Sequence, residues 1–160
     1  MQSMLHRFDR WMYQGGRPNR VARVLNRIGA VQYRYRIAAP KRAVTLEVIG
    51  RRSGKVIAFP LVLTEYDGQR YLVAMLGQQA NWVRNVRAAD GRAVLHHGRR
   101  EQVHLEEVEP SARAPILRRF LELAPGARSH APVDRDAPLT EFERIAPDYP
   151  VFRINPSTRT

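Results

Sequence analysis

Residues 44–85 read VTLEVIGRRSGKVIAFPLVLTEYDGQRYLVAMLGQQANWVRN, and this stretch decides the fold. Apolar, β-branched runs flank the loop Gly50–Lys55, which favours two strands joined by a tight connection. The Asp67-Gly68 pair between the next two runs is a strong hairpin signal. A helix is expected over about residues 80–89, so the stretch predicts consecutive hairpins followed by a short helix.

The loop Gly50–Lys55 has the sequence GRRSGK, with three cations between and beside two glycines. Glycine at both ends lets successive backbone N–H groups converge, and the Arg, Ser and Lys side chains add donors. The loop is therefore a candidate cradle for a phosphate or a carboxylate. The alternative is an ordinary hairpin turn whose charges are solvated.

The rest of the chain continues the alternation of strands and helices. Helices are expected from a Ser111 cap through Leu123 and over 139–145, and residues 125–138 are expected to form a surface loop. Antiparallel hairpins flanked by helices indicate an α+β fold. The expected strands are 43–49, 56–65, 70–76, 92–97, 100–108 and 151–155.

Composition limits the class of protein. A chain of 160 residues that is 44% hydrophobic can bury the core of one compact domain. It contains no uncharged apolar run of 18 residues and no apolar signal region near the N-terminus, so we expect a cytoplasmic protein. The absence of cysteine excludes disulfides, thiolate metal sites and cysteine nucleophiles.

The net charge of +12 is unevenly distributed, because residues 1–60 hold 13 basic and only two acidic residues. This asymmetry favours a polyanionic partner, namely an anionic cofactor, an acidic lipid surface or a nucleic acid. No recognised nucleic-acid motif accompanies the charge, so we do not expect a nucleic-acid partner.

Residues 1–30 are predicted to form amphipathic helices that precede a single domain over 31–160. One apolar face would contain Met4, Leu5, Phe8, Trp11 and Met12. Such a face either packs on its own domain, which we favour, or lies on the inner face of an anionic membrane as a peripheral contact.

One ordered series of motifs resembles the deazaflavin (F420)-dependent nitroreductase and quinone reductase family. The series is a strand, the G-R-R-S-G-K loop, a strand ending in Pro-Leu, the Asp-Gly turn, a Y-L-V-A strand and N-W-x-x-N. The resemblance covers about residues 44–100 and returns weakly at 149–154. It implies a split β-barrel of antiparallel strands with flanking helices. It also implies an enzyme that transfers a hydride from reduced coenzyme F420 to a small electron-poor acceptor such as a quinone or a nitroaromatic compound.

The same resemblance assigns cofactor-binding roles to residues of the stretch. The GRRSGK loop would hold the phosphate and glutamyl tail, Trp82 would wall the pocket, and Asn85 would lie near the phosphate. Tyr71 and Val73 would stand beside the deazaflavin ring. The residues implied for the anionic end are Arg51, Arg52, Ser53, Gly54 and Lys55, and those implied for the ring are Pro60, Leu61, Val62, Ala74 and Met75.

Residue types that perform chemistry by themselves are poorly arranged in this sequence. Ser53 has no neighbouring base, and consecutive His96 and His97 on a strand would point to opposite faces, so we expect no metal site. This pattern suits a reaction in which a cofactor carries the chemistry. His130 is the candidate proton donor because imidazole titrates near neutrality, and solvent is the alternative source.

Two departures from the family pattern keep other functions open. Val56 and Ile57 follow the loop where the family usually has a proline and a basic residue. Leu76 and Gly77 replace small polar and basic residues that commonly contact the cofactor. These changes favour a non-catalytic lipid or fatty-acid binding protein of the same fold, and an FMN-dependent reductase is a further alternative.

Overall fold

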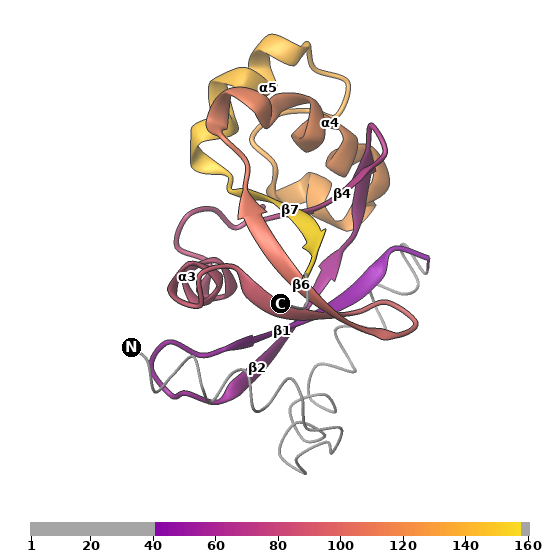
Figure 1. Cartoon of the computed structure of the whole chain (residues 1–160). Coiled ribbons are helices and arrows are strands. Elements are labelled where there is room, and N and C mark those ends of the chain that lie inside the picture. Colours follow the sequence, from indigo (N-terminus) through magenta and orange to yellow (C-terminus); the bar gives the residue numbers. More distant parts are fainter. Residues whose placement is uncertain (1–40, 158–160) are drawn as a thin grey trace.

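The computed structural model describes residues 41–157, which form one seven-stranded antiparallel sheet with helices around it (Figure 1). Every pair of neighbouring strands is antiparallel, in the order β2-β1-β5-β6-β7-β4-β3. The strands are β1 (Ala43–Ile49), β2 (Val56–Val62), β3 (Thr64–Tyr66), β4 (Gln69–Val73), β5 (Arg92–His96), β6 (Arg100–Glu107) and β7 (Val151–Pro156).

The sheet curls so that its two ends meet at one residue. β2 and β3 lie at opposite ends of the strand order, yet only Leu63 separates them in the chain. The N–H of Leu63 donates to the carbonyl of Arg42 at 2.7 Å, whereas Thr64 already pairs with Tyr71 of β4. A flat sheet could not join these two edges, and the split β-barrel and α+β class expected from the sequence are confirmed.

The interior of the curled sheet is filled by side chains that alternate along the strands. In β1, Val44, Leu46 and Val48 all point into this core, as a period of two requires. Leu72 of β4, Leu95 of β5 and Phe152 of β7 meet them there, each almost fully buried. The interior of the curled sheet is therefore a packed core.

Helix α3 (Asn81–Ala88) closes one side of this core. The Trp82 ring lies between Phe59 and Phe152, with ring centroids 6.5 Å and 5.6 Å away. Figure 1 shows α3 beside the end of the β1–β2 hairpin that carries the loop 50–55. The helix is thus anchored by its apolar face and leaves its polar side next to that loop.

A second layer covers the outside of β4 and β7. Helices α4 (Ala114–Leu123) and α5 (Leu139–Ile145) lie over these strands at the top of Figure 1. Phe120 and Phe142 pack there against Tyr71 and Val73, the outward residues of β4. Three short 3₁₀ helices border this layer: η1 (Pro110–Ala112), η2 (Pro125–His130) and η3 (Ala146–Asp148).

Several expected boundaries differ from the structure. The strand expected over 56–65 is broken at Leu63 by the curl, and the strand expected over 70–76 ends at Val73. Ser111 does not cap α4, because it lies within η1, and the residue before α4 is Arg113 without a side-chain capping bond. The expected loop 125–138 begins with η2.

The predicted N-terminal helices of residues 1–30 lie outside the described residues. Within residues 41–157, no helix has the length and apolar character needed to cross a bilayer.

Candidate functional site

The loop between β1 and β2 is closed by its own backbone. The N–H of Gly50 donates to the Lys55 carbonyl at 2.8 Å, and the N–H of Gly54 donates to the Gly50 carbonyl at 2.9 Å. The Lys55 N–H also donates to Ser53 Oγ at 3.2 Å. Gly54 adopts a φ of +66°, which glycine tolerates best, so the second glycine of the motif is needed for the turn.

The loop is fastened to α3 by one buried amide. Asn85 Oδ1 accepts hydrogen bonds from the Arg51 backbone N–H at 3.1 Å and from Arg51 Nη1 at 2.9 Å. Asn85 is only 2% exposed, because the apolar face of α3 holds it against the barrel. The two bonds fix both the backbone and the guanidinium of Arg51 relative to the helix.

These hydrogen bonds occupy most of the backbone N–H groups that were expected to bind an anion. Four of the six loop amides, those of Gly50, Arg51, Gly54 and Lys55, donate to protein atoms. The backbone cradle expected from the glycines is therefore limited to the amides of Arg52 and Ser53. The side chains of the loop are the other groups that can bind an anion here.

The side chains at the loop form a concentration of positive charge. Partial burial lowers the pKa of Arg51 most, and the neighbouring charges of Arg84 and then Arg52 lower it further. Within residues 41–157, no carboxylate forms an ion pair with Arg51, Arg52, Lys55 or Arg84. We call these four residues the cationic cluster, and they repel one another unless an anion lies between them.

Arg84 is the member of the cationic cluster that the sequence reasoning missed. It precedes Asn85 on α3 and is exposed, whereas Trp82, Val83, Asn85 and Val86 are buried. The amphipathic pattern around the N-W-V-R-N motif could have identified it as the exposed neighbour of a residue already assigned to the site.

The residues implied for the deazaflavin ring do not share one surface. Leu61, Ala74 and Trp82 belong to the barrel core. Val62 and Met75 instead pack with the outer layer under α4 and α5. The structure places these side chains on two faces of the sheet, so it brings together the anion-binding part of the predicted site but not the ring-binding part. Pro60 is buried on β2 beside Thr45 of β1.

His130, the candidate proton donor, lies at the end of η2 and is exposed. Its neighbours Ala127 and Ala131 pack with the outer layer, whereas the loop 50–55 is joined to α3 and the barrel core. The structure does not bring His130 to the cationic cluster.

The other histidines have separate partners. His96 Nε2 lies 2.8 Å from Glu47 Oε1, but the alignment is too poor for a hydrogen bond. His97, just after the end of β5, has its Nε2 2.9 Å from the Lys41 carbonyl oxygen. Among residues 41–157, no group of three metal-ligating side chains is close enough to hold an ion.

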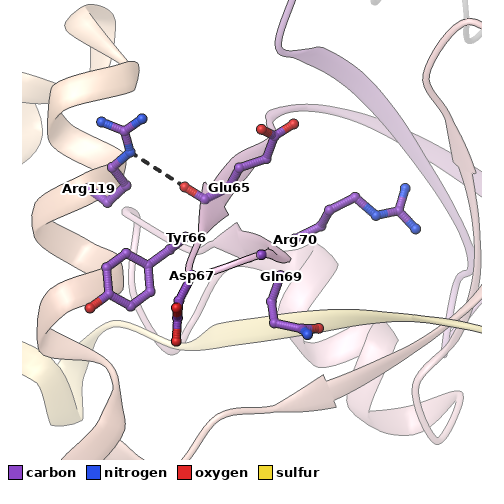
Figure 2. A pocket seen from close by; sticks show the side chains of 7 residues that line it. Glu65, Tyr66, Asp67, Gln69, Arg70 and Arg119 are labelled. Carbon is purple, nitrogen blue, oxygen red and sulfur yellow. Dashed lines mark hydrogen bonds between the residues drawn. The ribbon is translucent and has the colours of Figure 1, made fainter.

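A hollow at the β3–β4 hairpin contains none of the predicted site residues (Figure 2). Arg119 at its edge donates to the Glu65 carbonyl and to Glu122, and Arg70 points away to pair with Glu101. Both arginines of this hollow have carboxylate partners, which distinguishes it from the cationic cluster.

Comparison with known proteins gives a family match over most of the chain. The sequence pattern described as "F420H(2)-dependent quinone reductase" matches residues 20–141. The chain belongs to this family. The resemblance inferred from the loop, the hairpins and the N-W-x-x-N motif is thereby confirmed. No match was found among curated proteins.

Solved structures share the fold at low sequence identity. One, titled as an F420-H2 dependent reductase, is 20% identical, with 72% of this chain and 95% of that chain covered and a TM-score of 0.50. A conserved hypothetical protein from Mycobacterium tuberculosis is 17% identical over 73% of this chain and 74% of that one, with a TM-score of 0.52. A protein of unknown function from Agrobacterium tumefaciens is 15% identical over 79% and 55%, with a TM-score of 0.54. These likenesses concern the fold.

Proposed function

We propose that this protein is an F420-dependent reductase that transfers a hydride to an electron-poor acceptor such as a quinone or a nitroaromatic compound. The observation that supports this most strongly is the cationic cluster without carboxylate partners among residues 41–157, in a member of the quinone reductase family. F420 carries a phosphate and a glutamyl tail, and its anionic end fits a set of arginine and lysine donors.

The protein's part in the reaction is binding and orientation. When bound, reduced F420 supplies a hydride, which together with one proton converts a quinone to a hydroquinone. Arg51, Arg52 and Lys55 would hold the phosphate and tail, with Ser53 and Gly54 shaping the turn. Of the residues implied for the ring, Leu61, Ala74 and Trp82 share the barrel core, and these three are proposed to support the ring. Val62 and Met75 lie in the outer layer, and the proposal does not extend to them. Because His130 lies in the outer layer, we propose that the proton comes from solvent.

Turnover tests this function directly. Purified protein is mixed with reduced F420 and menadione or a nitroaromatic acceptor, and the return of the oxidised chromophore is followed by absorbance. We expect turnover with F420 and none with reduced FMN in its place. Activity with FMN alone would assign the FMN-dependent alternative, and no activity with either cofactor would refute a reductase.

A lipid binder of the same fold is the second candidate, because large apolar side chains are exposed next to the loop and before α3. Leu76 is 70% exposed and Ile57 is 37% exposed. A long-chain fatty acid combines an anionic head with an apolar chain, so it would suit these residues together with the cationic cluster. Tight fatty-acid binding without any F420 oxidation would favour this candidate.

A peripheral membrane contact of residues 1–30, the alternative to their packing on the domain, would bring the enzyme to a membrane-dissolved quinone.

A further inference from the structure

Two elements distant in sequence meet at the cationic cluster. Asn85 of α3 accepts two hydrogen bonds from Arg51 of the loop, so the loop and the helix form one rigid unit at this point. Arg84 is adjacent to Asn85 and exposed, and its charge acts directly on Arg51. The helix therefore adds a fourth cation to the three that the loop supplies.

The lack of ion pairs at this unit contrasts with many arginines elsewhere in residues 41–157. Those with a carboxylate oxygen within 4.0 Å are distributed over the sheet and the outer layer and include Arg42, Arg70, Arg87, Arg113, Arg119, Arg135, Arg144 and Arg153.

We propose that Arg84 is a ligand-binding residue that completes the anion site with Arg51, Arg52 and Lys55, and that Asn85 is a positioning residue that acts through Arg51. The site takes a ligand end with at least two neighbouring negative charges, such as a phosphate followed by a carboxylate or a second phosphate. Four cations from two elements, held close together, need more than one negative charge to offset their repulsion.

This inference rests on the proposed function only for the identity of the ligand as F420, because an anion site can exist without hydride transfer. Asn85 Oδ1 is occupied by the Arg51 backbone and guanidinium. Its effect on an anion should therefore come through the orientation of Arg51. A guanidinium has several donors in a fixed plane, so its orientation decides whether it can form paired bonds to a phosphate.

The test compares Arg84→Ala with Arg99→Ala, a matched loss of one exposed arginine on the β5–β6 turn. Affinities are measured by calorimetry for F420, for the deazaflavin that lacks phosphate and tail, and for inorganic pyrophosphate. We expect Arg84→Ala to weaken F420 and pyrophosphate about tenfold or more, the usual effect of one charge-assisted bond. The tail-less deazaflavin should bind both variants equally, and Arg99→Ala should match the wild type.

The role of Asn85 is tested by a double-mutant cycle on the same ligands. Asn85→Ala should weaken pyrophosphate binding in the wild-type background and have little further effect in Arg51→Ala, because both changes remove the same oriented guanidinium. Independent, additive losses would refute positioning through Arg51. If Asn85→Ala fails to fold, equal pyrophosphate affinity of Arg51→Ala and wild type refutes it equally well.

The outcomes separate this inference from the proposed function. Unchanged F420 and pyrophosphate affinity in a folded Arg84→Ala variant refutes the inference, while wild-type turnover would leave the function standing. Pyrophosphate binding that depends on Arg84, without any binding of F420, supports the site and refutes the function. If the wild type binds neither ligand, both are refuted.

Discussion

Helix α3 carries two arginines, three positions apart, with opposite surroundings. Arg87 donates to Glu107 through Nε at 2.8 Å and Nη2 at 2.9 Å, and to Gln78 Oε1 at 2.7 Å. Glu107 also accepts a bond from Arg113 at 3.1 Å. Arg84, in contrast, has a charge that lowers the pKa of Arg51 and has no carboxylate partner within residues 41–157.

Arg87, Glu107 and Arg113 form what we call the paired region, and their hydrogen bonds give this region a structural role. Arg113 is 2% exposed, and it donates to the carbonyls of Val108 at 2.8 Å and Ala146 at 3.0 Å. With Glu107 it therefore ties β6 to the start of α4 and the end of α5. Gln78 extends the network by donating to the Pro147 carbonyl at 2.9 Å. In this region both arginines bind the carboxylate of Glu107, whereas the cationic cluster leaves its charge available to a ligand.

The largest effect is expected from Arg113→Ala in the paired region. This change removes the Arg113 donors of the Val108 and Ala146 carbonyls, of which Ala146 keeps the N–H of Tyr149, and it removes one cation from Glu107. Breaking a buried, hydrogen-bonded ion pair typically costs about 3–5 kcal/mol, and Glu107 keeps Arg87, so the lower end is expected. Urea denaturation should show this loss in the free energy of unfolding. The control Arg84→Ala should unfold like the wild type, and equal stability of the two variants would invalidate the comparison.

In the cationic cluster the expected effect is on binding. The double variant Arg52→Ala, Lys55→Ala removes two donors from the loop, each contributing roughly 1.5–3 kcal/mol to a charge-assisted bond with phosphate. F420 affinity should fall at least tenfold while the melting temperature stays unchanged, since neither side chain has an ion-pair partner among residues 41–157. A folded double variant with wild-type affinity would show that the loop does not bind the cofactor.

The smallest expected effect is a dependence of stability on pH. It distinguishes the two regions because the paired region contains an acidic group, Glu107. The hydrogen bond from Arg87 holds the pKa of Glu107 below its usual value, burial acts in the opposite direction, and the charges of Arg87 and Arg113 lower the pKa further. The contribution to stability is therefore complete above the ordinary glutamate pKa and is lost as the pH falls through the lowered value.

Unfolding free energies of wild type and Glu107→Gln, measured from neutral pH into the acid range, test this dependence. Their difference should shrink on acidification. A constant difference would show that the charge of Glu107 contributes nothing to the free energy of unfolding.

The sequence predicted the strands well where alternation is local. β1 was expected and found at 43–49, because Val44, Leu46 and Val48 point to one face. The break at Leu63 was not predicted, since it comes from the passage of the chain from β2 at one edge of the sheet to β3 at the other and not from a turn residue.

The site was predicted only in part, because a sequence pattern indicates local features and not contacts between distant elements. The GRRSGK motif identified the cations of the loop, which are local in sequence. Neither the bond between Arg51 and Asn85 nor the approach of Arg84 follows from spacing, because both depend on how α3 packs on the barrel. Sequence reasoning also could not distinguish a Trp82 that walls a pocket from the Trp82 found between Phe59 and Phe152.

The cationic cluster of the loop and α3 is proposed to bind the anionic end of F420. The most direct test is the salt dependence of the F420 dissociation constant, measured by titration for the wild type and for Arg84→Ala. Because exposed charges are screened by salt, the account predicts that wild-type affinity falls steeply with ionic strength and that the variant shows a smaller slope. A wild-type dissociation constant that does not change with salt would contradict it.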